Sequence, residues 1–122
     1  MLHDCDTRTG SSCTGTRKNG INLIYASGHC HAPSCLSMEL YNADTGDLIC
    51  EVKPTIGQGT NARFDEKNYI ALAPCLFGSE ADGLIPPQFL SYATNLMSIK
   101  RNNNTNGHLG EMASWQMRGV MV

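Results

Sequence analysis

The sequence has few charged residues and no long apolar run. Asp, Glu, Lys and Arg make up 16% of its 122 residues, well below the ~25% of an average soluble domain. The nine basic residues occur singly or in two isolated pairs, Arg17-Lys18 and Lys100-Arg101, too few to predict a nucleic-acid-binding surface. No stretch approaches the ~18 consecutive apolar residues of a membrane span. We therefore expect one folded domain with no nucleic-acid partner and no membrane span.

The common catalytic signatures are also absent from the sequence. It contains no Gly-x-Ser-x-Gly motif, no phosphate-binding loop and no dinucleotide-binding fingerprint. Its clustered acidic residues, Asp65-Glu66 and Glu80 to Asp82, stand in polar surroundings that would not shift a carboxyl pKa. These absences disfavour hydrolases, nucleotide-dependent enzymes and acid–base pairs built on these carboxylates.

Cysteine, by contrast, is abundant and even in number. The six cysteines are Cys5, Cys13, Cys30, Cys35, Cys50 and Cys75. Such a count in a short chain predicts disulfides and an oxidising, extracellular compartment. Cysteine-bound zinc is the alternative, but no two Cys-x2-Cys pairs occur. Oxidation of Cys30 and Cys35 also argues against either thiol as a nucleophile beside the nearby histidines.

Two further features concern secretion. Asn103-Asn104-Thr105 is an N-glycosylation sequon in a polar, turn-like run. The first residues, Met1 to Cys5, have neither the basic nor the apolar region of a signal peptide. A secreted composition without a signal peptide indicates a processed chain, a trimmed chain or a piece of a longer secreted glycoprotein, and we favour the last. Its expected partners are other domains of that precursor or copies in an extracellular assembly.

The hydrophobic pattern predicts an all-β fold, an antiparallel β-sandwich or jelly roll stapled by disulfides. Residues 1–20 are polar and predict an irregular arm, whereas residues 21–122 form the single β-sandwich domain. The expected strands cover residues 21–26, a hairpin over 35–53, and residues 69–73, 96–100 and 110–122. The expected core consists of Leu23, Ile24, Leu36, Met38, Leu40, Leu48, Ile49, Val52, Ile70, Leu72, Leu96, Ile99 and Trp115.

The most informative stretch is Gly28-His29-Cys30-His31, at the end of the first expected strand. Side chains of a strand alternate between faces, so His29 and His31 should share one face while Cys30 takes the other. Two imidazoles on one face are half of a metal site. The alternative is that both are ordinary surface histidines.

A second group of potential ligands, His108, Glu111 and Met112, lies near the other end of the chain. Two histidines and a thioether favour copper, particularly Cu(I). Adding His108 or Glu111 would give a site that zinc also accepts. The alternatives are a solvated turn for His108 and core packing for Met112, one of six methionines.

Several short motifs of the sequence occur in an order that is typical of a known protein family. They are Ile24-Tyr25, His29-x-His31, Glu39-Leu40-Tyr41, Asp44-Thr45-Gly46 to Cys50, Asn68-Tyr69-Ile70, Cys75 and His108-x-Gly110-x-Met112. In this order residues 21–122 resemble the plant stress up-regulated nodulin-like family. The family has no well-defined activity, so the resemblance implies architecture more than function. Because Cys50 and Cys75 end predicted strands within the resembling part, we expect them to pair.

More distantly, the chain resembles the second, jelly-roll domain of copper type II, ascorbate-dependent monooxygenases of the peptidylglycine α-hydroxylating type. These enzymes bind copper through a His-x-His pair and a late methionine. The resemblance implies His29, His31 and Met112 as ligands, with His108 outside the ligand set. The enzymes also need a second copper, held by three histidines in a preceding domain. This chain has four histidines in all, so by itself it should not complete that reaction.

Two functions therefore remain open. The first is a secreted β-sandwich that binds a single metal, copper in preference, through His29, His31 and Met112. The second is a metal-free structural or interaction domain of the cell surface or of an extracellular assembly.

Overall fold

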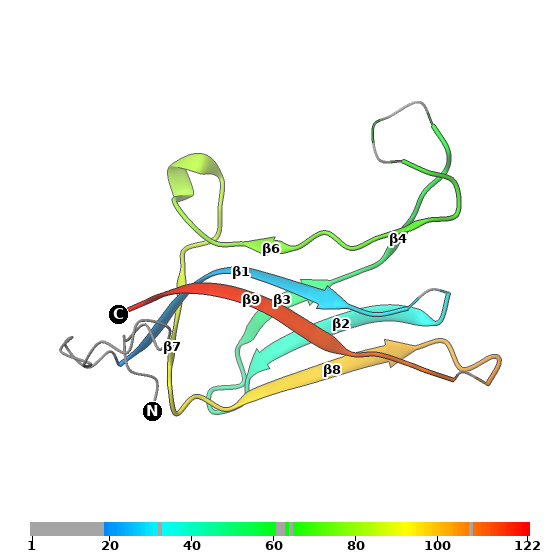
Figure 1. The fold of residues 1–122 in the computed structure, drawn as a ribbon. Coiled ribbons are helices and arrows are strands. Elements are labelled where there is room, and N and C mark those ends of the chain that lie inside the picture. The colour runs from blue at the N-terminus through cyan, green and yellow to red at the C-terminus, as the bar shows by residue number, and fades with distance from the viewer. Residues whose placement is uncertain (1–18, 32, 61–62, 64, 108) are drawn as a thin grey trace, which may run out of the picture.

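The computed structural model describes residues 19–31, 33–60, 63, 65–107 and 109–122 (Figure 1). Cys5, Cys13 and His108 therefore lie outside the described residues, as does almost all of the expected N-terminal arm. The described part contains the strands β1 (Gly20–His29), β2 (Cys35–Asn42), β3 (Leu48–Val52), β4 (Thr55–Ile56), β5 (Ile70–Ala71), β6 (Cys75–Leu76), β7 (Gln88–Ser91), β8 (Leu96–Asn102) and β9 (Ser114–Met121), with a short 3-10 helix, η1 (Glu80–Asp82). The predicted all-β, antiparallel fold class is confirmed.

β1 is the inner strand of the first sheet. It pairs with β9 along one side and with β6 and β7 along the other, always antiparallel. The second sheet has the order β3-β2-β8, and β4 and β5 form a separate two-stranded ribbon. β2 and β3 are the predicted hairpin, and Gly46 in its turn adopts a φ of 81°, a conformation that favours glycine.

The core lies between the two sheets. Its main cluster consists of Leu23, Ala26, Leu40, Ile49, Cys50, Val52, Phe77 and Leu90. The Cys50–Cys75 disulfide joins β3 of one sheet to β6 of the other, which confirms the pairing expected from the resemblance. A second cluster of Cys30, Cys35 and Met38 lies at the end of the sandwich where β1 stops, and a Cys30–Cys35 disulfide closes it.

Four residues of the expected core are instead substantially exposed: Ile24, Leu36, Leu48 and Leu96. The pairing register of β1 with β9 shifts between Leu23 and Tyr25, and that of β2 with β8 shifts between Cys35 and Ser37. Each irregularity inserts one residue out of alternation, which turns Ile24 and Leu36 outward. Leu48 stands beside a third such shift, opposite Tyr41.

β9 shows the predicted alternation, with Trp115 and Met117 packed against the core and Ser114, Gln116 and Arg118 exposed. It does not return along β8, the strand that precedes it, but crosses to the other sheet and pairs with β1. A hydrogen bond of 2.8 Å from Trp115 Nε1 to Ser98 Oγ connects β9 back to β8. Within the part of the chain that the structure describes, no helix is long and apolar enough to span a membrane.

Candidate functional site

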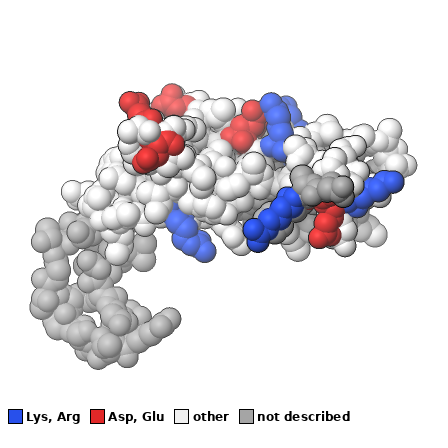
Figure 2. All heavy atoms as spheres, turned by 90° about the horizontal axis from the view of Figure 1, so that it is seen from above, with Lys and Arg blue, Asp and Glu red and all other residues white. Residues whose placement is uncertain are grey.

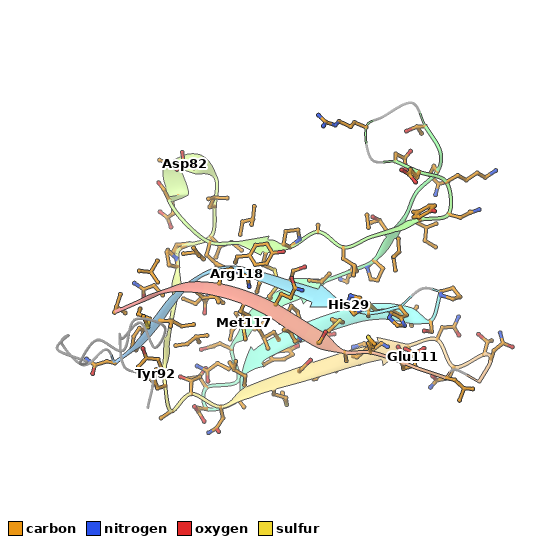
Figure 3. The ribbon with its side chains drawn as sticks, in the orientation of Figure 1. His29, Asp82, Tyr92, Glu111, Met117 and Arg118 are labelled. Carbon is orange, nitrogen blue, oxygen red and sulfur yellow. A yellow bond between two sulfur atoms is a disulfide. The ribbon has the colours of Figure 1, made fainter. Side chains whose placement is uncertain are left out.

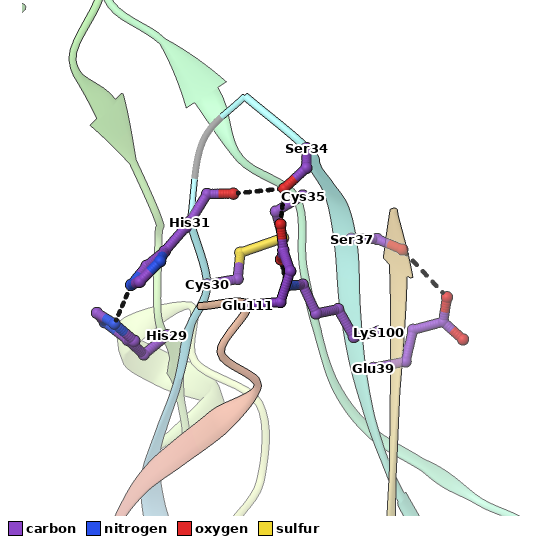
Figure 4. Close-up of a disulfide and its surroundings, with 9 residues drawn as sticks. All are labelled: His29, Cys30, His31, Ser34, Cys35, Ser37, Glu39, Lys100 and Glu111. Carbon is purple, nitrogen blue, oxygen red and sulfur yellow. Dashed lines mark hydrogen bonds and ion pairs between the residues drawn. A yellow bond between two sulfur atoms is a disulfide. The ribbon is translucent and has the colours of Figure 1, made fainter. Parts of the chain in front are cut away.

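His29 is the last residue of β1 (Figure 3), and His31 follows it by two residues. Both are exposed, whereas Cys30 between them is 3% exposed and packs inward. The predicted division of the three side chains between two faces is therefore confirmed. The two Nε2 atoms are 3.3 Å apart, and the rings are nearly perpendicular with centroids 5.2 Å apart (Figure 4).

This spacing suits a shared metal ion as well as a hydrogen bond. Imidazole nitrogens bind zinc at about 2.0–2.1 Å, so two of them on a tetrahedral ion of this size stand roughly 3.3 Å apart. The same distance admits a hydrogen bond between two neutral rings when one donates its Nε2–H. The donor set, two exposed imidazoles with neighbouring Nε2 atoms, thus fits a copper or zinc ion.

The chain after His31 is held in place by the disulfide and by Ser34. The amide of Cys35 donates to the carbonyl oxygen of His31 at 3.1 Å, closing a turn. The Ser34 hydroxyl lies 3.3 Å from the same oxygen. Because Cys30 and Cys35 bracket this turn and are bonded to each other, the backbone that carries His31 is tied to the start of β2.

Ser34 also reaches across the sandwich to the segment before β9. Its hydroxyl is 2.5 Å from Glu111 Oε1, and Lys100 Nζ of β8 forms an ion pair with Glu111 Oε2 (Figure 4). Ser34 is 2% exposed, and the Lys100 side chain is 10% exposed. A short polar network therefore joins the turn at His31, β8 and residue 111.

The strand register brings the late methionine toward the histidines. Ser114 of β9 is the pairing partner of His29, and Met112 precedes Ser114 by two residues. Met112 is 51% exposed, so core packing does not account for it. The structure therefore brings His29, His31 and the segment of Met112 to one end of the sandwich.

The remaining candidates are distributed as follows. His108 lies outside the described residues. Glu111 is engaged with Ser34 and Lys100. Among the described residues, no three side chains of the types His, Cys, Asp and Glu are grouped as metal ligands; a thioether does not belong to those types.

A buried carboxylate on the second sheet, Glu39, is separate from this site. Glu39 of β2 is 6% exposed and accepts hydrogen bonds from Arg101 Nε and Tyr41 Oη, each at 2.8 Å. These two donors, with a weaker contribution from Ser37, lower the pKa of Glu39 to about 2. The same contact raises the pKa of Tyr41. Glu39 is thereby held as a carboxylate in a structural network.

Charge elsewhere is dispersed. On the face shown in Figure 2, Lys and Arg side chains stand in several separate places with Asp and Glu between them.

Sequence reasoning missed Ser34 and Lys100 as parts of the site. Their partner, Glu111, is 77 residues from Ser34, a separation at which no local pattern carries a signal.

No family model, no curated protein and no solved structure matches the chain. The resemblances drawn from the sequence motifs thus stay predictions, and the function is argued from the site itself.

Proposed function

We propose that this domain binds a single copper ion through the imidazoles of His29 and His31 and the thioether of Met112. The observation that carries the proposal is the 3.3 Å separation of the two Nε2 atoms on an exposed face. Two soft or borderline nitrogen donors with a thioether favour copper, Cu(I) above all.

The role of the chain in this proposal is to hold three ligands and leave the ion accessible. A bound copper ion would supply one-electron redox chemistry. His29 and His31 are exposed, so a small ligand from solvent can reach an ion between them. The enzymes that the chain resembles use a second copper in a preceding domain, so copper binding, storage or a partial redox role suits this domain by itself. A preceding domain of a longer precursor would supply the missing half.

Copper titration of the purified, oxidised protein tests the proposal. We expect one equivalent of Cu(I) to bind, and His29→Ala/His31→Ala to weaken its binding by at least ~100-fold, because two of the three ligands are lost. His3→Ala serves as the matched control for general loss of a histidine. His108→Ala tests whether that residue is an additional ligand. Unchanged affinity in the double variant would refute the copper site.

The proposal places the domain in the secretory pathway or outside the cell, with a glycan on Asn103. Both described disulfides are compatible with that location. Asn103 and Thr105 are exposed just after β8, and the Thr105 hydroxyl is 2.5 Å from Asn103 Oδ1. Expressed through a eukaryotic secretory pathway, the protein should lose mass on treatment with a glycan-removing amidase. Asn103→Gln should abolish that loss, whereas Asn104→Gln, which leaves the sequon intact, should not.

A structural or interaction domain is the second candidate, and one observation favours it. The outer face of the first sheet carries Phe89 and Val120 on either side of Asn22, exposed by 53% and 55%. Exposed apolar side chains on the same face of a sheet often mark contact surfaces. On this reading metal-free protein should self-associate or bind a precursor domain, and Phe89→Ser/Val120→Ser should abolish the association. Light scattering of the metal-free protein measures it, and a monomer at all concentrations with no precursor-domain binding would exclude this candidate.

A further inference from the structure

Glu111 occupies an unusual place for a carboxylate next to a proposed copper ligand. It precedes Met112, but its own oxygens are committed to Ser34 and Lys100. The Glu111 side chain is only 27% exposed. It is therefore anchored away from the outer face on which His29 and His31 lie.

The direction of this anchor follows from Lys100. In β8, Lys100 pairs with Met38 of β2, which is fully buried. Cross-strand partners project to the same face of a sheet, so the stem of Lys100 lies on the core side and its ammonium meets Glu111 there. The Lys100 side chain is 10% exposed, and an ammonium so poorly solvated needs its carboxylate partner.

The anchor has a consequence for the next residue. Where a chain is extended, adjacent side chains project to opposite sides. With Glu111 held inward, an extended path into β9 directs Met112 outward, together with Ser114, which stands opposite His29. Ser34 adds a second restraint, because it contacts both Glu111 Oε1 and the carbonyl oxygen of His31.

We propose that Glu111 is a positioning residue that sets Met112 against the His29/His31 pair, through its ion pair with Lys100 and its hydrogen bond with Ser34. This inference rests on the proposed copper site. It assigns to Glu111 no contact with the metal; the residue acts by fixing the backbone from which the thioether projects.

The experiment compares the two oxidation states of copper. Loss of the thioether weakens Cu(I) more than Cu(II), because sulfur is the soft ligand. We expect Glu111→Ala to lower Cu(I) affinity about tenfold, as Met112→Ala does, while Cu(II) affinity changes less than about twofold. X-ray absorption of the Cu(I) form should lose its copper–sulfur scattering in both variants. Glu111→Asp keeps the carboxylate that Ser34 and Lys100 contact, so it should retain more of the Cu(I) affinity than Glu111→Ala.

Two further variants separate positioning from folding. Lys100→Leu/Glu111→Ala removes this ion pair without leaving an unpaired ammonium and without adding a second thioether, and should show the same selective loss of Cu(I) affinity. Glu51→Ala removes an exposed ion pair with Lys53, 3.0 Å long, elsewhere on the surface, and should change neither affinity. Circular dichroism and thermal unfolding confirm that each variant folds.

The outcomes for the two proposals are distinguishable. Retained copper–sulfur scattering and Cu(I) affinity in Glu111→Ala and in the double variant would overturn the positioning role. An unaltered Cu(I) affinity in Met112→Ala would also overturn the positioning role, because Met112 would then not be a ligand. Copper binding by His29 and His31 would be unaffected by that result. Undiminished copper binding in His29→Ala/His31→Ala would overturn the site and the positioning role together.

Discussion

At the scale of single residues, Glu39 links the fold to pH. Its pKa falls from 4.5 to about 2 because Arg101 and Tyr41 donate hydrogen bonds to the carboxylate. The unfolded chain therefore binds one more proton than the folded chain between these values. The stability that Glu39 provides is complete above pH about 4.5 and is lost as the pH falls toward 2.

We expect the free energy of unfolding to decline between pH 5 and pH 2, with a shallower decline in Glu39→Gln. Chemical denaturation at a series of pH values measures both slopes. Arg101→Met removes the main donor to Glu39, so it too should flatten the curve. Parallel curves for wild type and Glu39→Gln would show that Glu39 is not the group responsible.

At the scale of the element, substitutions of two adjacent residues in β1, Leu23 and Ile24, test which side chains belong to the core. Leu23 is fully buried, whereas Ile24 is 40% exposed because of the register shift that follows Leu23. Leu23→Ala should lower the free energy of unfolding by ~2–5 kcal/mol, the range for an aliphatic side chain removed from a core. Ile24→Ala, the matched control, should cost less than about 1.5 kcal/mol. Equal losses would mean that Ile24 is also a core residue.

The strands show where sequence reasoning succeeds. Period-two alternation correctly predicted the faces of His29, Cys30 and His31 and of β9. It failed at Ile24 and Leu36, because a bulge shifts the alternation by one residue without changing composition. It also overestimated the length of β5: a strand was predicted over residues 69–73, but only Ile70 and Ala71 form one. The network of Ser34, Lys100 and Glu111 could not be predicted from the sequence for another reason. It forms only because β9 crosses to the other sheet and pairs with β1.

At the scale of the whole molecule, the two described disulfides differ in the length of chain that they close. Cys50–Cys75 spans 25 residues and joins the two sheets, whereas Cys30–Cys35 spans 5. Chain-entropy arguments assign about 3.5 kcal/mol to the longer loop and about 2 kcal/mol to the shorter one. Cys50→Ala/Cys75→Ala should therefore destabilise the protein more than Cys30→Ala/Cys35→Ala. Urea denaturation of both variants measures the difference, and the reverse order would contradict the loop-length argument.

The pairing of β1 with β9 joins the first described strand to the last. During synthesis on the ribosome, β1 emerges early and stays without this neighbour until Met121 has left the exit tunnel. Pairings so distant in sequence form slowly. His29 and His31 are therefore synthesised well before β9, and it is the pairing of β9 with β1 that completes this end of the sandwich. Metal loading at this site would follow the synthesis of β9, and a product truncated before β9 would carry the histidines without the completed site.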